Sequence, residues 1–155
     1  VDYSQAKVFG AKESPYEFKL AFRRINELFI AEAKKYDVGK QLKKEVSEIS
    51  LEAVNKVNEA INPDELFTSR TQYTLTKEQV NAAIQALPIP KEAGVGMVFI
   101  AEFLNKAASR GTYQVVFFDT DTKEIIEEWS TDGKAGGFGL RNYWAGSIHN
   151  AIKHL

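Results

Sequence analysis

The chain has 155 residues, of which 44% are hydrophobic and 26% are charged. This composition is typical of one soluble globular domain and differs from that of a disordered, collagen-like or membrane-spanning chain. The 20 basic and 21 acidic residues leave a net charge of −1, which disfavours general nucleic-acid binding because no positive field surrounds the whole molecule. The absence of cysteine excludes disulfides, thiolate nucleophiles and cysteine-ligated metals. We expect one domain over residues 1–155, with no cofactor.

The first predicted element in chain order is a short strand at residues 6–9, closed by Gly10. A helix is then predicted to begin at Pro15, because the sequence Ser14-Pro15-Tyr16-Glu17 combines a capping serine, a proline at the first helical position and a glutamate at the third. Apolar residues at spacings of three and four continue to Tyr36, so the predicted helix extends to about that residue.

The segment from residue 40 to residue 63 has weaker signals. Residues 43–49 are compatible with a strand, residues 50–61 with a helix, and residues 66–67 with a brief strand after the turn at 62–64. A second capping box, Thr76-Lys77-Glu78-Gln79, predicts another helix that ends before Pro88.

The last third of the chain predicts a strand meander followed by a helix. In residues 97–104, the side chains expected on either face of a strand are apolar, with the exception of Glu102. This pattern is typical of a central strand that is covered on both faces. Residues 113–118 have a similar pattern, and residues 125–131 form a second hairpin strand, nearer the edge of the sheet because it carries two glutamates. The closing helix begins at about Asn142. The predicted fold is a single α/β domain, whose mixed or mainly antiparallel sheet is packed by three main helices.

A glycine-rich loop, residues 133–139, precedes the last predicted helix and is the candidate binding site. Backbone N–H groups and a helix N-terminus at such a position can receive an anion. The candidate ligand-binding residues are Lys134, Gly136, Gly137, Gly139, Arg141 and Asn142. The loop matches neither a Walker loop nor the G-x-G-x-x-G pattern. A structural interpretation is favoured, in which the glycines allow positive φ angles and close packing of the last helix against the sheet.

The titratable residues form no recognisable catalytic or metal-binding pattern. His149 and His154 are five residues apart, about 140° around a helix, and so do not face one metal ion together. Because Glu102 lies within an apolar strand, its carboxylate must be exposed to solvent, paired with a basic group, or have a raised pKa. Solvent exposure is the favoured interpretation. Asp119 resembles the first ligand of a calcium loop, but Glu124 occupies the position that requires glycine. We therefore predict no catalytic residue and no metal ligand.

Three segments resemble a family of secreted or lipid-anchored proteins of gut-dwelling Gram-negative anaerobes, to which no activity is assigned. They read VDYSQAKVFG, GVGMVFIAEFLNKAASRGTYQVVFFDTDTKEII and GKAGGFGLRNYWAGSIHNAIK. More distantly, the strand meander, glycine-rich turn and closing helix are similar to envelope lipoproteins that activate cell-wall synthases or assist secretion. The resemblance implies a periplasmic or outer-membrane-associated protein, attached to a membrane only through a removed N-terminal leader.

These observations favour a non-enzymatic accessory or interaction protein of the cell envelope, with a protein or another envelope component as its partner. A small-ligand or anion-binding protein that uses the glycine-rich loop is the alternative. A hydrolase that uses Glu102 or His149 is the third and least favoured interpretation.

Overall fold

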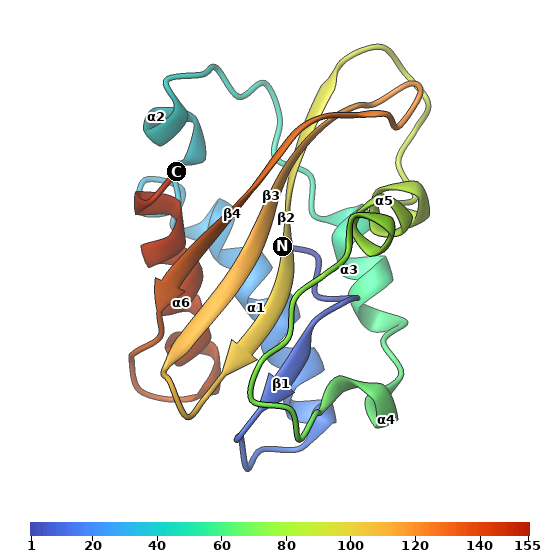
Figure 1. The fold of residues 1–155 in the computed structure, drawn as a ribbon. Helices are drawn as coiled ribbons and strands as arrows, with labels where there is room; N and C mark the ends of the chain where they lie inside the picture. Colours follow the sequence, from blue (N-terminus) through green and yellow to red (C-terminus); the bar gives the residue numbers. More distant parts are fainter.

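Four strands form one mixed sheet in the order β1-β2-β3-β4 (Figure 1), in a computed structural model that describes residues 1–155. The strands are β1 (Lys7–Phe9), β2 (Val95–Asn105), β3 (Arg110–Asp119) and β4 (Ile125–Lys134). β1 pairs in parallel with the end of β2, whereas β2, β3 and β4 form an antiparallel meander. Six helices complete the chain, so the predicted α/β fold with a C-terminal meander is confirmed.

Two long helices, α1 (Pro15–Ala31) and α6 (Leu140–Lys153), cover one face of the sheet and enclose the larger core. This core of 23 buried residues includes Phe22 from α1, Tyr113 from β3 and Trp144 from α6. Burying a large apolar side chain stabilises a fold by about 1.5–3 kcal/mol. The amphipathic stripe that predicts α1 therefore faces the sheet, as its spacing requires.

A smaller core lies on the opposite face, under α3 (Glu52–Glu59) and α5 (Lys77–Ala86). It covers β2 and the C-terminal half of β3, where Val116 and Phe118 are buried. Residues 98–104 of β2 are all buried, which confirms the predicted central strand. The rest of this face is polar, because the strand alternation places Gln114 of β3 opposite Ser130 of β4.

Both predicted capping boxes are present. In α1, the Ser14 hydroxyl accepts a hydrogen bond from Glu17 N at 3.2 Å, and Ser14 N donates to the Glu17 carboxylate at 2.6 Å. Thr76 and Gln79 make the equivalent pair of bonds at the start of α5. Each box satisfies backbone N–H groups that the first turn of a helix leaves free, so both helices begin where the sequence predicts.

The predicted end of the first helix is wrong. The α1 helix ends at Ala31, and Glu32 already has non-helical backbone angles (φ −123°, ψ 51°). Tyr36 is nevertheless buried, because a run of turns returns its ring to 5.2 Å from that of Phe29. The apolar spacing thus continues to Tyr36, whereas the helical conformation of the backbone ends at Ala31.

Between α1 and α5, the helix expected over residues 50–61 is present as α3, but two predicted strands are not. Residues 43–49 form no strand: Lys43 caps the short helix α2 (Val38–Leu42) in the left-handed region, and the residues that follow lie exposed. The predicted strand at 66–67 is replaced by the one-turn helix α4 (Pro63–Leu66), followed by a single bridge from Phe67 to β1. These short segments take their conformation from contacts that local sequence does not specify.

Candidate functional site

The glycine-rich loop is held against α6 by backbone contacts. Gly136 N donates to the Tyr143 carbonyl at 3.1 Å, and a Cβ added at Gly146 would lie only 2.4 Å from the Gly136 carbonyl oxygen. Gly137 (φ 125°) and Gly139 (φ 87°) occupy backbone regions that residues with side chains rarely adopt. The loop therefore has a defined shape, and Phe138 within it is exposed.

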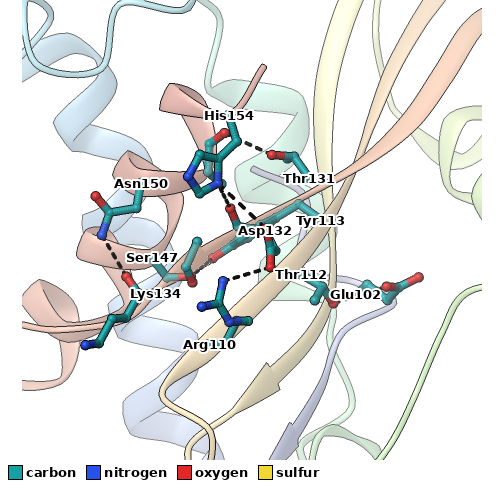
Figure 2. Close-up of polar contacts among 12 residues, drawn as sticks. Glu102, Arg110, Thr112, Tyr113, Thr131, Asp132, Lys134, Ser147, Asn150 and His154 are labelled. Carbon is teal, nitrogen blue, oxygen red and sulfur yellow. Dashed lines mark hydrogen bonds and ion pairs between the residues drawn. The ribbon is translucent and has the colours of Figure 1, made fainter.

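The close approach of α6 to the sheet explains why a residue without a side chain, Gly133, stands at the end of β4. A Cβ there would lie 1.9 Å from the Ser147 carbonyl oxygen and 2.5 Å from Ala151 N, both of which are backbone atoms of α6. At the same contact, the Ser147 hydroxyl donates to the Gly133 carbonyl, and the Tyr113 hydroxyl donates to Ser147 Oγ, each at 2.9 Å (Figure 2). The structure thus shows positive φ at Gly137 and Gly139 and close packing at Gly133, as the structural interpretation of these glycines expects.

Two hollows flank this loop. The larger, with a volume of about 410 Å³, lies between α1 and the start of α6. Its walls are Glu17, Leu20, Ala21, Arg24, Phe138, Gly139, Leu140, Arg141 and Asn142. The smaller has a volume of about 220 Å³ and adjoins the first at Gly139 and Leu140. Its other walls are Lys12, Glu13, Lys106, Gly137, Tyr143 and Trp144.

The arginines of the larger hollow have no carboxylate partner. Arg24 and Arg141 make no ion pair, whereas the neighbouring Arg23 is paired with both Glu27 and Glu59. The Glu17 carboxylate belongs to the α1 capping box. The two guanidinium groups are therefore able to bind an external anion.

Two exposed apolar side chains, Phe138 and Leu20, line the same hollow, and a third, Tyr16, lies one helical turn before Leu20. Phe138 is 96% exposed, Tyr16 71% and Leu20 50%. Tyr16, Leu20 and Arg24 are four residues apart on α1, so they form one stripe on its outer side. We call the surface that combines these groups the loop face. Its residues are Lys12, Tyr16, Leu20, Arg24, Lys106, Phe138 and Arg141.

The structure brings together only part of the predicted site. Gly139, Arg141 and Asn142 line the larger hollow, and Gly137 lines the smaller one. The Gly136 N–H is already bonded to Tyr143. Lys134 lies in neither wall, and its carbonyl accepts a hydrogen bond from Asn150 at 2.9 Å (Figure 2).

Sequence reasoning missed the contribution of α1 to the site. The one available signal was Leu20, an apolar residue that lies outside the stripe of α1 residues that enter the core. Phe138 was inside the loop considered, but nothing in its spacing indicated that it would be exposed. Arg24 looked like any solvated helix residue.

Glu102 is buried, which corrects the expectation that it is exposed. It is 5% accessible, and both carboxylate oxygens are bonded. One accepts from the Thr112 hydroxyl at 3.1 Å (Figure 2), and the other from Leu75 N at 2.7 Å and Gln114 Nε2 at 3.2 Å. Hydrogen bonds of this kind stabilise a buried carboxylate, and here they tie the segment before α5 to the sheet.

The two histidines lie apart in different surroundings. His154 is exposed at the edge of the sheet, with Nδ1 2.7 Å from the Asp132 carbonyl oxygen, while Arg110 binds the Asp132 carboxylate at 2.8 Å (Figure 2). The His149 ring packs against that of Tyr36 at 5.6 Å. No cluster of acidic and histidine side chains is arranged to hold a metal ion.

Asp119 forms an ordinary hairpin turn. Its carboxylate accepts hydrogen bonds from Asp121 N at 2.8 Å and from Thr122 N at 3.0 Å, and these bonds lower the pKa of Asp119. Both N–H groups belong to the turn itself, so the carboxylate shapes the connection between β3 and β4. This arrangement agrees with the turn that the sequence favoured over a calcium loop.

Comparisons with protein-family models, curated proteins and solved structures gave no match. None of the six helices is long and apolar enough to span a bilayer. The candidate site therefore rests on the geometry of this chain alone.

Proposed function

We propose that the protein is a non-enzymatic accessory protein of the cell envelope that binds another envelope component through the loop face. The observation that carries this proposal is the exposure of Phe138, which is 96% accessible on a loop with a defined backbone. Burying a phenylalanine side chain is worth about 1.5–3 kcal/mol, and the fold forgoes this gain. A partner that covers Phe138 recovers it.

The positions of the titratable residues support the non-enzymatic part of the proposal. Both oxygens of Glu102 are occupied by hydrogen bonds, and the Asp119 carboxylate is bound by its own turn. His149 packs on an aromatic ring and lines neither hollow. The groups considered for catalysis thus have structural contacts of their own. The envelope location follows from the family resemblance.

The proposal is tested by adding envelope extract from a gut-dwelling Gram-negative anaerobe to the isotopically labelled protein and recording amide NMR spectra. We expect signals of residues 16–24 and 136–142 to shift or broaden, because these residues form or adjoin the loop face. The Phe138→Ser variant should lose this response. Ile126→Ser is the matched control, because Ile126 is 58% exposed on β4, outside the loop face. Changes confined to other residues, or an unchanged response in Phe138→Ser, would contradict the proposal.

A second candidate function is the binding of a small anionic ligand in the larger hollow. It is favoured by the first turn of α6, which no side chain caps, together with Arg24 and Arg141. Titration with phosphate or sulfate should then shift the amide signals of residues 139–142, and Arg141→Gln should abolish the shifts. The absence of shifts up to high-millimolar anion would remove this function.

A further inference from the structure

We infer that the envelope component bound by the loop face is an anionic phospholipid surface, with Phe138 inserted among the lipid headgroups. This inference rests on the proposed function and specifies its partner. It adds a membrane contact that the sequence-based expectation, attachment only through a removed leader, does not include.

The apolar part of the loop face suits a shallow insertion. Its exposed apolar side chains are only Phe138, Leu20 and Tyr16, and Phe138 is one wall of the larger hollow. A stable protein interface buries roughly 800 Å² on each partner around an apolar centre. A few protruding apolar side chains surrounded by cations are instead what a protein lying on a bilayer uses.

The charges of the loop face complement an anionic surface. Four cations, Lys12, Arg24, Lys106 and Arg141, line the two hollows, against two carboxylates. One of these carboxylates, that of Glu17, is engaged in the capping box. The chain as a whole has a net charge of −1, so the positive surplus is local. Basic residues close to anionic lipid headgroups are attracted to them.

The fold places these groups at one end of the molecule. The segment before α1, the turn between β2 and β3, and the loop before α6 lie together at the lower end of the view in Figure 1. They supply Lys12, Lys106 and Phe138 respectively, and Lys106 Nζ lies 3.6 Å from the Tyr143 ring centroid, beside the loop. Phe138 lines the larger hollow together with Arg24 and Arg141, and its two neighbours in the chain line the smaller hollow, which holds the two lysines.

The first test is co-sedimentation of the full chain with vesicles of two compositions. We expect binding to vesicles made from equal parts of phosphatidylglycerol and phosphatidylcholine, weak binding to phosphatidylcholine alone, and release at high salt, which screens the charges. Phe138→Ser should weaken partitioning by about tenfold or more, because the apolar contact is lost. Ile126→Ser, the control with an exposed apolar residue elsewhere, should bind like the original chain.

The second test distinguishes the contribution of the arginine charges to vesicle binding from that of the Phe138 ring. The double variant Arg24→Glu/Arg141→Glu should lose binding, whereas Lys34→Glu/Lys91→Glu, which changes two exposed lysines outside the loop face, should retain most of it. The indole of a Phe138→Trp variant should shift its emission to shorter wavelength only with anionic vesicles. Circular dichroism checks that each variant is folded.

Absence of binding to anionic vesicles, or equal binding by Phe138→Ser, would overturn the inference. A Phe138-dependent NMR response to the soluble proteins of the envelope extract, without vesicle binding, would leave the proposed function intact and identify a protein partner. Loss of both responses would remove the inference and the proposed function together.

Discussion

Tyr3 shows how a single buried hydroxyl can reduce the stability of this fold. The ring is fully buried and stacked on Phe22 at 3.9 Å, but its hydroxyl has no hydrogen-bond partner. A buried polar group without a partner costs about 1–3 kcal/mol. Tyr113, by contrast, is equally buried and donates its hydroxyl to Ser147.

We predict that Tyr3→Phe raises the free energy of unfolding by about 1 kcal/mol, because it removes an unbonded hydroxyl without changing the ring. Tyr113→Phe should lower it by a similar amount, since Ser147 loses a donor. Urea unfolding of both variants measures the difference. Equal destabilisation by the two changes would show that the Tyr3 hydroxyl is bonded, for instance to an enclosed water.

His149 should make the folded state sensitive to mild acid. Partial burial is the largest cause that lowers the pKa of His149, and the nearby positive charges of Lys153 and Lys35 lower it further. The Glu32 carboxylate acts in the opposite direction. The folded state therefore prefers the neutral ring, and stability is lost as the pH falls from the ordinary histidine pKa of about 6.5 through the lower folded-state pKa. We predict that His149→Gln reduces the drop in melting temperature between neutral and mildly acidic pH. If the melting temperature of the variant falls as much as that of the original chain, groups other than His149 cause the sensitivity to acid.

At the scale of the elements, lysines from other segments complete the ends of two helices. Lys19 Nζ donates to the carbonyl of Glu59, the last residue of α3, at 2.8 Å and to that of Ile61, just beyond the helix, at 3.0 Å. Lys123 Nζ donates to the carbonyls of Gln85 and Leu87 at the end of α5, at 2.9 and 2.8 Å. Cations stabilise helix C-termini because unpaired carbonyls carry partial negative charge there, so these contacts fasten both helices to the rest of the fold.

We predict that Lys123→Met lowers the free energy of unfolding by about 1 kcal/mol and speeds hydrogen exchange in the last turn of α5. Lys77→Met is the matched control, because Lys77 lies at the opposite end of the same helix, where a cation is not favoured. Faster exchange in both variants, or in neither, would show that the lysine contact does not hold the end of the helix.

The contact between α6 and the sheet predicts opposite results for two glycines of one segment. Gly133→Ala should destabilise the fold by about 3 kcal/mol or more, or prevent folding, because its Cβ would overlap backbone atoms that cannot rotate away. Gly136→Ala should be tolerated, since no heavy atom lies within 4 Å of its added Cβ. Thermal unfolding of both variants checks the pair, and a stable Gly133→Ala protein would show that α6 can move away from β4.

Sequence patterns predicted elements whose signals are local. Capping boxes fixed the start of α1 and α5, and the doubly apolar pattern identified β2, because these signals depend on neighbouring residues alone. The end of α1 was not predictable, since Tyr36 keeps the apolar spacing while the backbone turns back. Glu102 was misread because the groups that bind it, such as Leu75 N and Gln114, come from segments whose proximity exists only in the folded chain.

At the scale of the whole molecule, the sheet order and the loop face depend on contacts between distant segments. The three residues of β1 pair with residues 103–105, which lie 96 positions later in the sequence, and no spacing rule encodes that choice. The larger hollow likewise joins α1 to a loop more than a hundred residues later. The glycine-rich segment was predictable as one wall of a site, but its opposing wall from α1 was not.

The free side of β4 shows how the molecule protects an unpaired edge of its sheet. Side chains of α6 reach around this edge, where Asn150 binds the carbonyl of Lys134 and His154 lies against that of Asp132. The remainder carries Glu127 and Glu128, and like charges disfavour strand addition. The closing helix therefore also shields the protein from edge-to-edge aggregation.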